Sequence, residues 1–476
     1  MDEKQPPAGI TVADWQATPK SVQQLVVGLL ATVDQLQQAV AQLREQVNKN
    51  SQNSSKPPSS DPPSVKRKPP KVKGQRQQGG QPGHQGKGRH LKPPDQVSRF
   101  VVSRPISCGA CGTLLLGEDA DPSRHQVTEL PRIEPEVVEY QVHCLRCEAC
   151  GQATRGQWPA EMPTGCLGPR LQAVTGYLSG RFGVSRRDTQ ELLATLFRVE
   201  VGLGTIPAQE QRLSQALAQP VEAAQTFVRQ QPAVNVDETG WKEANRSGWL
   251  WVGSTPEVAV FLLRPTRSRQ ELTNLLGADY AGIVGSDRAS AYNALPDQQR
   301  QLCWSHLRRD FQALVDRGGH SALVGRLLLA QVKLFFPLWH RVRDGTLTRQ
   351  AFQEAMGPVR REVESLLQLS TLLVEHRQTH ATCRNILKHN AALWTFVDQE
   401  GIEPTNNAAE QALRRGVLWR KRSFGSQSET GSRFVERILT VVISLRRQQR
   451  DVLDFLTDAC QALVSGIAPP SLLPAA

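Results

Sequence analysis

Residues 49–104 limit most strongly how this chain of 476 residues can fold. The stretch holds nine prolines, six glycines and 13 Lys and Arg, with Asp61 and Asp95 as its acidic residues and few large apolar side chains. Such a composition cannot bury enough apolar surface to offset the entropy lost on ordering. We therefore predict a disordered basic linker at 49–104, and a single small domain is excluded.

Residues 20–48, which precede this linker, carry a heptad repeat. Its two core positions are occupied by Val26, Val33, Val40 and Val47, and by Val22, Leu29, Leu36 and Leu43. β-branched residues at the first core position with leucine at the second favour a parallel two-stranded coiled coil. We predict a coiled-coil helix and a homodimer or higher oligomer; the alternative is an amphipathic helix packed on its own chain.

Residues 105–160 contain two Cys-x-x-Cys pairs, and five of the nine cysteines of the chain fall between residues 108 and 150. An odd number of cysteines with this crowding favours metal ligation in a reducing compartment over a disulfide framework. Four thiolates complete a closed tetrahedral site, so we predict a structural Zn²⁺ in a zinc-binding domain. His143 and Cys144 are substitute ligand candidates, and unliganded thiols in a small β-rich module are the alternative. The predicted ligands are Cys108, Cys111, Cys147 and Cys150.

Residues 165–230 have the pattern of a helical region. A glycine-containing turn at 180–185 separates two helical stretches, and Arg186 and Arg187 begin the second. This layout is similar to a DNA-binding helix-turn-helix, in which the second helix contacts DNA. An ordinary helical hairpin would have the same pattern.

Three acidic residues stand where strands end or a helix begins. Asp237 and Asp287 each end an apolar strand-like run, a place where aspartate also serves as a turn former or cap. Glu410 lies in the first turn of a helix, where a capping box with Asn407 is the alternative, and Glu403 lies nearby. Three carboxylates hold two divalent cations in phosphodiester chemistry, and hard oxygen ligands suit Mg²⁺ or Mn²⁺.

The basic charge of the chain indicates a polyanionic partner. The formal net charge is +12, and residues 406–450 form a second basic block with 10 Lys and Arg against three acidic residues. Cations beside the carboxylates would offset the repulsion of DNA, although a solvated helix face has the same composition. Beyond Arg186 and Arg187, the predicted DNA contacts are His306, Arg309, Arg414, Arg415, Arg420, Lys421 and Arg422.

Several motifs, taken together and in order, carry a family resemblance that runs from about residue 20 to residue 450. They are Asn53-Ser-Ser-Lys-Pro-Pro-Ser-Ser-Asp61, Gly80-Gln-Pro-Gly-His84, the paired Cys-x-x-Cys, Val236-Asp237-Glu-Thr-Gly-Trp241, Ser286-Asp287-Arg, Cys303-Trp-Ser-His-Leu-Arg-Arg309 and Asn406-Asn-Ala-Ala-Glu410. This set resembles the IS66 family of bacterial insertion-sequence transposases. The resemblance implies an RNase H-like catalytic domain at 232–450 with a helical insertion at about 320–400, and Asp237, Asp287 and Glu410 as catalytic acids.

The expected function is that of a DNA transposase, which cuts element ends by metal-dependent phosphodiester hydrolysis and joins the 3′-OH to target DNA. Accessory proteins of the same element are possible partners. A zinc-ribbon dimeric DNA-binding regulator without catalysis and an RNase H-like nuclease without strand transfer use the same features and remain alternatives.

The expected fold class is multidomain α+β, with residues 451–476 as a C-terminal helix and tail. No run approaches the roughly 18 consecutive apolar residues of a membrane-spanning helix, and the first residues lack the layout of a secretory signal. We therefore expect an intracellular, nucleoid-associated protein with no membrane partner.

Overall fold

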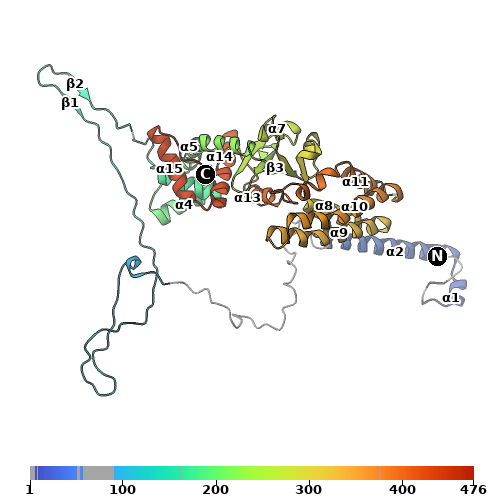
Figure 1. Cartoon of the computed structure of the whole chain (residues 1–476). Helices are drawn as coiled ribbons and strands as arrows, with labels where there is room; N and C mark the ends of the chain where they lie inside the picture. The colour runs from blue at the N-terminus through green and yellow to red at the C-terminus, as the bar shows by residue number, and fades with distance from the viewer. Residues whose placement is uncertain are drawn as a thin grey trace.

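A computed structural model describes residues 6–7, 9–50, 54–56, 91–160, 162–163, 165–374 and 376–475. Most of the linker predicted at 49–104 lies outside these described residues. The described part consists of an N-terminal helical segment, an extended arm, and a mixed α+β body from residue 165 onward (Figure 1). The predicted α+β class is confirmed in this coarse form.

A five-stranded mixed sheet forms the centre of the body. Its strands are β3 (Ala233–Glu243), β4 (Arg246–Ser254), β5 (Ala259–Arg264), β6 (Ile283–Ser286) and β7 (Arg300–Leu302). The order across the sheet is β5-β4-β3-β6-β7. β3, β4 and β5 are antiparallel neighbours, whereas β6 runs parallel to β3 and β7 parallel to β6.

Helices cover both faces of the sheet, which explains why β4 and β5 are apolar on both sides. On one face, Leu250 and Phe261 pack against Ala412 and Leu413 of α13. The other face packs against a larger helical layer. The helices around the sheet are α3 (Pro169–Tyr177), α5 (Thr205–Ala216), α6 (Ala218–Arg229), α7 (Arg269–Leu276), α13 (Asn407–Ser423), α14 (Glu429–Arg447) and α15 (Val452–Ser465).

Helix α14 covers the open edge of β5 with side-chain hydrogen bonds. Three outward backbone amides of β5 donate to side chains of α14 that lie four residues apart. The pairs are Ala259 N to Ser444 Oγ at 3.0 Å, Phe261 N to Thr440 Oγ1 at 3.0 Å and Leu263 N to Glu436 Oε1 at 2.5 Å. Four helical residues rise about 6 Å and two strand residues about 6.6 Å, so the two repeats match along this contact. The helix thereby satisfies an edge that would otherwise invite another strand.

A helical insertion with its own apolar core follows β7. Its core is built around Trp304, Phe335 and Trp394. The elements are α8 (Trp304–Asp316), α9 (Gly319–Arg343), α10 (Arg349–Leu373), α11 (Arg377–Lys388), η6 (Ala391–Leu393) and α12 (Thr395–Asp398). Among the described residues, α9 is the one helix long and apolar enough to cross a membrane, and it packs against α8 and α10 through residues such as Leu328 and Phe335.

The helical region at 165–230 joins the body instead of standing apart from it. Between α3 and α4 (Arg186–Phe197), a π-helical turn η3 (Leu178–Phe182) gives the two-helix layout that the sequence predicts. α3 and α5 pack against α15, so the segment from residue 452 onward completes the same core. Short 3-10 turns η4 (Ser290–Ala294) and η5 (Asp297–Gln299) lie between β6 and β7.

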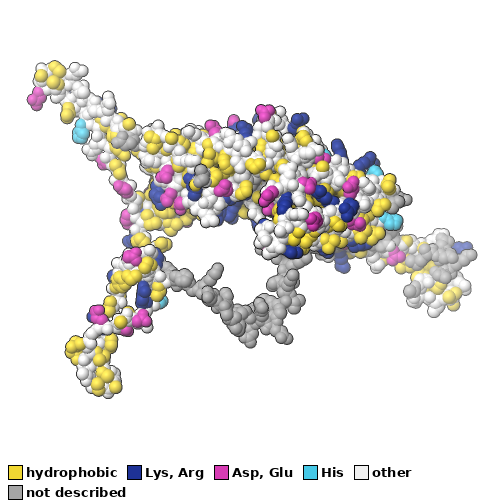
Figure 2. All heavy atoms as spheres, in the orientation of Figure 1, with side chains coloured by type: hydrophobic (Ala, Val, Ile, Leu, Met, Phe, Trp, Pro, Cys, Tyr) yellow, Lys and Arg dark blue, Asp and Glu magenta, His cyan; other side chains and the backbone are white. Residues whose placement is uncertain are grey.

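The N-terminal segment and the arm bury little apolar surface. α1 (Val12–Ala17) precedes α2 (Lys20–Asn48), and seven of the eight heptad core side chains of α2 are exposed. The arm at 91–163 contains η2 (Pro94–Gln96) and the two-stranded β1 (Cys144–Arg146) and β2 (Ala153–Arg155). Figure 2 shows apolar side chains spread over the surface of this arm, among them Phe100, Val102 and Leu116.

Candidate active site

Asp237 and Asp287 lie on neighbouring parallel strands at the same end of the sheet. Asn235 of β3 pairs with Gly285 of β6, and each aspartate comes two residues after its paired position. Successive strand residues alternate between faces, so Asp237 shares the face of Asn235. The parallel register between β3 and β6 therefore brings together two aspartates that are 50 positions apart in the sequence.

Backbone contacts fix the third acid, Glu410, in the first turn of α13. Asn406, just before the helix, donates from Nδ2 to the carbonyl of Val236 at 3.4 Å, so the helix begins beside the residue that precedes Asp237. On the neighbouring strand, the amide of Cys303 donates to the carbonyl of Ser286 at 2.8 Å. The starts of α8 and α13 are thus both tied to the strand residues that precede the aspartates. Asp287 follows its strand as predicted, but Asp237 does not end β3, because pairing with β4 continues from Asp237 to Glu243.

The three carboxylates act on one another electrostatically. Burial is the largest cause that raises the pKa of Asp237 well above its usual value, followed by the negative charges of Glu238, Asp287 and Glu410. Burial also raises the pKa of Glu410, with Arg309 opposing and Asp287 adding to this effect. The oxygens of the three predicted acids do not all lie within 4.8 Å of one another, but neighbouring acids of this kind favour a shared proton or bound cations. Its oxygen donors fit Mg²⁺ or Mn²⁺, and Glu410 Oε1 is buried without a hydrogen-bond partner among the described residues.

Arg267 links Asp287 to a buried acid that the sequence analysis missed, Glu238. The Nη2 atom of Arg267 lies 3.3 Å from Asp287 Oδ2, and its Nε donates to Glu238. The hydroxyl of Tyr292 also donates to Glu238, and the Arg267 guanidinium lies 5.2 Å from the Trp249 ring. Burial raises the pKa of Glu238, so these donors compensate a costly carboxylate. An acidic residue in the middle of an apolar strand was the available signal.

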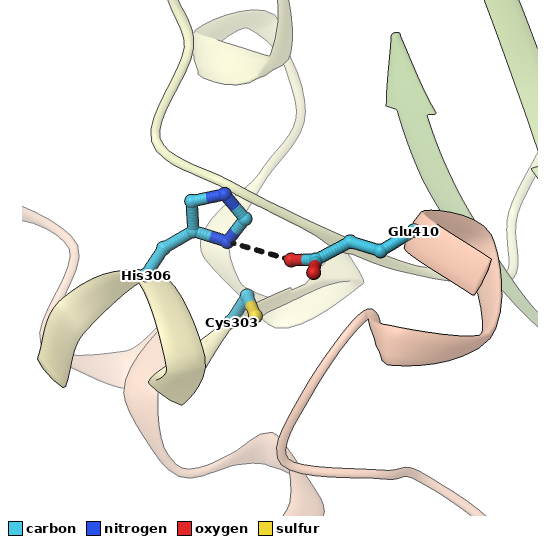
Figure 3. A group of neighbouring side chains, drawn as sticks. All are labelled: Cys303, His306 and Glu410. Carbon is cyan, nitrogen blue, oxygen red and sulfur yellow. Dashed lines mark ion pairs between the residues drawn. The ribbon is translucent and has the colours of Figure 1, made fainter. Parts of the chain in front are cut away.

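His306 of α8 faces Glu410, and Cys303 lies beneath this pair (Figure 3). His306 Nδ1 is 3.5 Å and Arg309 Nη2 is 3.7 Å from Glu410 Oε1. Burial, followed by the charge of Arg309, lowers the pKa of His306 to about 4, so its imidazole is neutral at pH 7. The Cys-x-x-His spacing of Cys303 and His306 was the overlooked signal for the thiol.

A cleft of about 1360 Å³ lies beside this site between α8, α9 and the start of α13; Arg309 lines it, but Asp237, Asp287 and Glu410 do not. Glu403, the alternative third acid, lines the cleft and accepts a hydrogen bond from Trp339 Nε1 at 3.2 Å. Glu410, in contrast, is one of the charges that act on Asp237. The basic side chains that line the cleft are Arg308, Arg309, Lys333, His340 and Arg343.

The five basic residues predicted on α13 fall into two groups. Arg414, Arg415 and Lys421 are exposed. Arg420 donates to the carbonyl of Gly240 and to Thr239 Oγ1, whereas Arg422 donates to the carbonyl of Phe182 at 2.8 Å. These last two arginines therefore also hold α13 against β3 and the η3 turn.

Arg415 belongs to a cluster of like charges with Arg181 and Arg446. Burial lowers the pKa of Arg181, and the positive charges of Arg415 and Arg446 lower it further. The Nε of Arg181 is buried without a hydrogen-bond partner among the described residues. Clustered guanidinium groups of this kind are suited to phosphate.

Arg186 and Arg187 stand at the start of α4, where Ser185 caps the helix. Arg186 Nη2 lies 3.0 Å from Glu210 Oε2 of α5, while Arg187 is exposed. Only Arg187 of this pair is thus free of an ion pair within the described part of the chain.

The two Cys-x-x-Cys pairs form two turns with the same backbone hydrogen bonds. In each, the amide of the first cysteine, Cys108 or Cys147, bonds to the carbonyl five residues on, at 2.9 and 2.8 Å. The following glycines, Gly112 and Gly151, both have φ +74° and donate back to the first cysteine. Both turns thus present their thiols alike, but no three of these cysteines meet within ligand distance in the described part.

Hydrogen bonds shift the thiol chemistry within these turns. Hydrogen bonding from Thr113 lowers the pKa of Cys111 to about 7, and hydrogen bonds from the backbone of Cys150 and Ala149 lower the pKa of Cys147. Metal ligands are thiolates, so the lowered values favour the ligating form. Neither His143 nor Cys144 joins a candidate ligand group of three in the described part of the chain.

Comparison with known proteins identifies the class. The model of the transposase IS66 family matches residues 168–433, and a family of unknown function (DUF6444) matches residues 6–90. The match over 168–433 covers the sheet, the helices from α3 to α13 and the insertion, and it places the chain among the transposases. The chain belongs to the IS66 family of transposases, as the sequence resemblance predicted.

Three similar proteins come from Sinorhizobium fredii, and all are uncharacterised. The protein y4hP is 24% identical over 403 residues, covering 77% of this chain and 72% of its own length. The protein y4jD is 22% identical over 411 residues and covers 78% of each chain, and y4qI is 24% identical over 246 residues, covering 46% of this chain and 44% of its own. Family membership implies a transposase role, DNA as partner and a divalent metal ion as cofactor.

Proposed function

We propose that this chain is a DDE-type transposase that cuts the ends of an insertion sequence and joins the freed 3′-OH to target DNA. The observation that carries the proposal is the placement of Asp237 within β3, of Asp287 directly after the parallel neighbour β6 and of Glu410 in the first turn of α13, with the charges of Asp287 and Glu410 acting on Asp237. Their mutual effect on pKa supports a shared cation site. Mg²⁺ or Mn²⁺ fits the all-oxygen donor set.

The sheet topology supports an RNase H-like catalytic domain. Three antiparallel strands are followed by two parallel ones in the order β5-β4-β3-β6-β7, which places the first strand of the domain, β3, at the centre. The first acid is on this central strand and the second follows its parallel neighbour. The helical insertion separates the second acid from the third along the chain without separating them in space.

The residues of the chain would each perform a defined task in two successive phosphodiester reactions. Divalent cations bound by the three carboxylates would activate the attacking oxygen and stabilise the leaving 3′ oxygen. Arg309 favours the ionised form of Glu410, and Arg267 orients Asp287. In hydrolysis, water attacks phosphorus and the P–O3′ bond breaks; in joining, the freed 3′-OH attacks a target phosphodiester and displaces a target 3′ oxygen.

Basic groups around the site are proposed to hold the DNA backbone. Arg308 and Lys333 line the cleft that leads away from Glu410, and both are exposed without an ion-pair partner within the described part of the chain. The cluster of Arg181, Arg415 and Arg446 offers a second phosphate contact. Phosphate contacts of this kind position DNA without reading its sequence.

The arm and α2 are proposed to supply zinc binding and self-association. The identical turns at Cys108 and Cys147 support a shared Zn²⁺ site, and closing it would bring the exposed apolar side chains of the arm together. The exposed heptad stripe of α2 supports a parallel two-stranded coiled coil between two copies.

A strand-joining assay tests the proposed function. A labelled duplex with the end sequence of the DNA element and a free 3′-OH is incubated with a plasmid and either Mg²⁺ or EDTA. We expect joining that requires Mg²⁺ and is lost in Asp237→Asn, with binding of the duplex retained. Mg²⁺-dependent nicking without joining would instead identify a nuclease, and binding without any nicking would identify a regulator.

A further inference from the structure

Two helix starts converge on a mixed set of donor atoms that the proposed reaction does not use in full. Cys303 precedes α8, His306 lies in its first turn and Glu410 lies in the first turn of α13 (Figure 3). The sulfur, a ring nitrogen and a carboxylate oxygen of these residues all lie within 4.8 Å of one another. A thiol, an imidazole and a carboxylate are the donors of transition-metal sites, since Mg²⁺ prefers oxygen alone.

Two of these donor atoms lack a hydrogen-bond partner within the described part of the chain. His306 Nδ1 and Glu410 Oε1 are both buried without a hydrogen bond among the described residues, although they face each other at 3.5 Å. Buried polar atoms left without partners cost free energy, and a pair of them indicates a missing shared partner. In a tetrahedral zinc site with bonds of about 2.1 Å, nitrogen and oxygen ligands stand about 3.4 Å apart. The observed separation matches that edge.

The thiol is close enough to complete the set. A sulfur–nitrogen edge in a zinc tetrahedron is about 3.6 Å, so closing the site from the observed 4.8 Å limit takes a shift of at most about 1.2 Å. Cys303 is 1% exposed, whereas the side chains of His306 and Glu410 are 26% and 36% exposed. An ion would therefore enter past the imidazole and the carboxylate and reach the thiol at the bottom of the site.

The surrounding contacts hold the site in shape. Trp304, between the two α8 ligands, is fully buried in the core of the insertion and its amide bonds to the carbonyl of Pro404 at 2.9 Å. Ser305 donates to Asn407 Oδ1 at 3.3 Å, and the amide of Asn406 lies 3.4 Å from the sulfur of Cys303. These contacts tie α8 to α13, so the ligands on the two helices are pre-organised relative to each other.

We propose that Cys303, His306 and Glu410 form a Zn²⁺-selective site whose occupation withdraws Glu410 from the catalytic carboxylates. Zn²⁺ at this site, with three protein ligands and one open position, would compete with the Mg²⁺ that Asp237 and Asp287 share with Glu410. The inhibitory consequence rests on the proposed function, whereas metal binding itself does not.

Cobalt binding to the full-length chain tests the site directly. The four cysteines of the two Cys-x-x-Cys pairs, Cys108, Cys111, Cys147 and Cys150, are first replaced by serine to remove their signal. Co²⁺ is then added to this background protein while the thiolate-to-cobalt absorption band is followed. We expect a band in this background that is lost with Cys303→Ser and kept with Cys383→Ser, a matched control in which an equally buried thiol is removed. A background protein without the band, or a band that survives Cys303→Ser, would overturn the proposal.

A second variant and a thermal melt distinguish loss of metal binding from loss of folding. His306→Gln keeps the cysteine, and it is expected to weaken Zn²⁺ binding, measured by chelator competition, by at least about tenfold. Thermal melts of each variant show whether it is folded. Unchanged Zn²⁺ affinity in folded His306→Gln would also refute the site.

The effect of Zn²⁺ on activity is measured separately from metal binding. At fixed Mg²⁺, we expect Zn²⁺ to reduce DNA cleavage by the background protein more strongly than by its Cys303→Ser variant, each relative to its own activity without zinc. Equal inhibition of the two proteins would refute the link to Glu410. A chain that binds Co²⁺ through Cys303 but never cleaves DNA would contradict the proposed function and leave the metal site standing.

Discussion

The hydrogen bonds from β5 to α14 predict a specific loss of stability when Thr440 is replaced by valine. Valine keeps the shape of threonine and removes the acceptor for the amide of Phe261, which lies 3.0 Å from Thr440 Oγ1. Both residues are fully buried, so water does not replace the lost partner. An unsatisfied buried amide costs about 1–3 kcal/mol.

This cost converts into a measurable change in melting temperature. A domain of about 150–250 residues loses about 2–4 °C per kcal/mol, so the range spans about 2–12 °C. The body of this protein is larger, which favours the lower part of the range. The measurement is thermal unfolding of full-length Thr440→Val, followed by circular dichroism.

Thr226→Val is the matched control, because Thr226 Oγ1 donates to the carbonyl of Glu222 at 3.1 Å just as Thr440 Oγ1 donates to the carbonyl of Glu436 at 2.8 Å. Thr226 is exposed, however, and accepts no hydrogen bond from a strand amide within the described part of the chain. We expect Thr226→Val to melt within about 2 °C of the wild type. If Thr440→Val melts with the control, the edge of β5 does not depend on α14, and the reasoning is refuted.

Further predictions concern the site and the oligomer. The folded-state pKa of Asp237 is raised, so its contribution to stability is present below the unfolded pKa and is lost as pH rises through the folded value. Asp237→Asn should therefore raise the melting temperature in EDTA at pH 7. The difference in melting temperature between variant and wild type should shrink at pH 4, and also when Mg²⁺ is added to both proteins. A melting temperature that falls in EDTA would contradict the electrostatic account. Arg267→Gln should lower kcat for cleavage at least about tenfold and shift its Mg²⁺ dependence upward, whereas exposed Arg269→Gln should change neither. Leu36→Glu should dissociate the oligomer in sedimentation and Gln38→Glu, outside the heptad core, should not; equal behaviour of the two would argue against a coiled coil.

The sequence pointed to the proposed catalytic acids more directly than to their surroundings. Asp237 and Asp287 stand out because each follows apolar strand-like residues; Asp287 does end its strand, whereas β3 continues to Glu243, because the polar residues after Asp237 pair with β4 and hide the true strand end. The choice of Glu410 over Glu403 depended on the family resemblance, because the helical insertion removes any informative spacing. Only the contact between Asn406 and Val236 shows why the helix of Glu410 lies beside the first acid.

The remaining site residues were hidden by tertiary structure. Glu238 is a strand residue whose partners, Arg267 and Tyr292, come from loops and turns that no local pattern connects to it. Cys303 reads as an ordinary buried cysteine until α8 and α13 are placed together. Sequence patterns also do not reveal that α15 packs on α3, since this contact joins segments almost 300 residues apart.

The order in which the three acids occur along the chain has a consequence for protein synthesis. Asp237 and Asp287 leave the ribosome early, whereas Glu410 follows the whole helical insertion, and α14, which closes the edge of β5, comes later still. A polypeptide that stops within the insertion therefore lacks the third carboxylate, and one that stops at the end of α13 lacks the helix that completes the sheet. Interrupted translation thus yields fragments that lack part of the proposed active site.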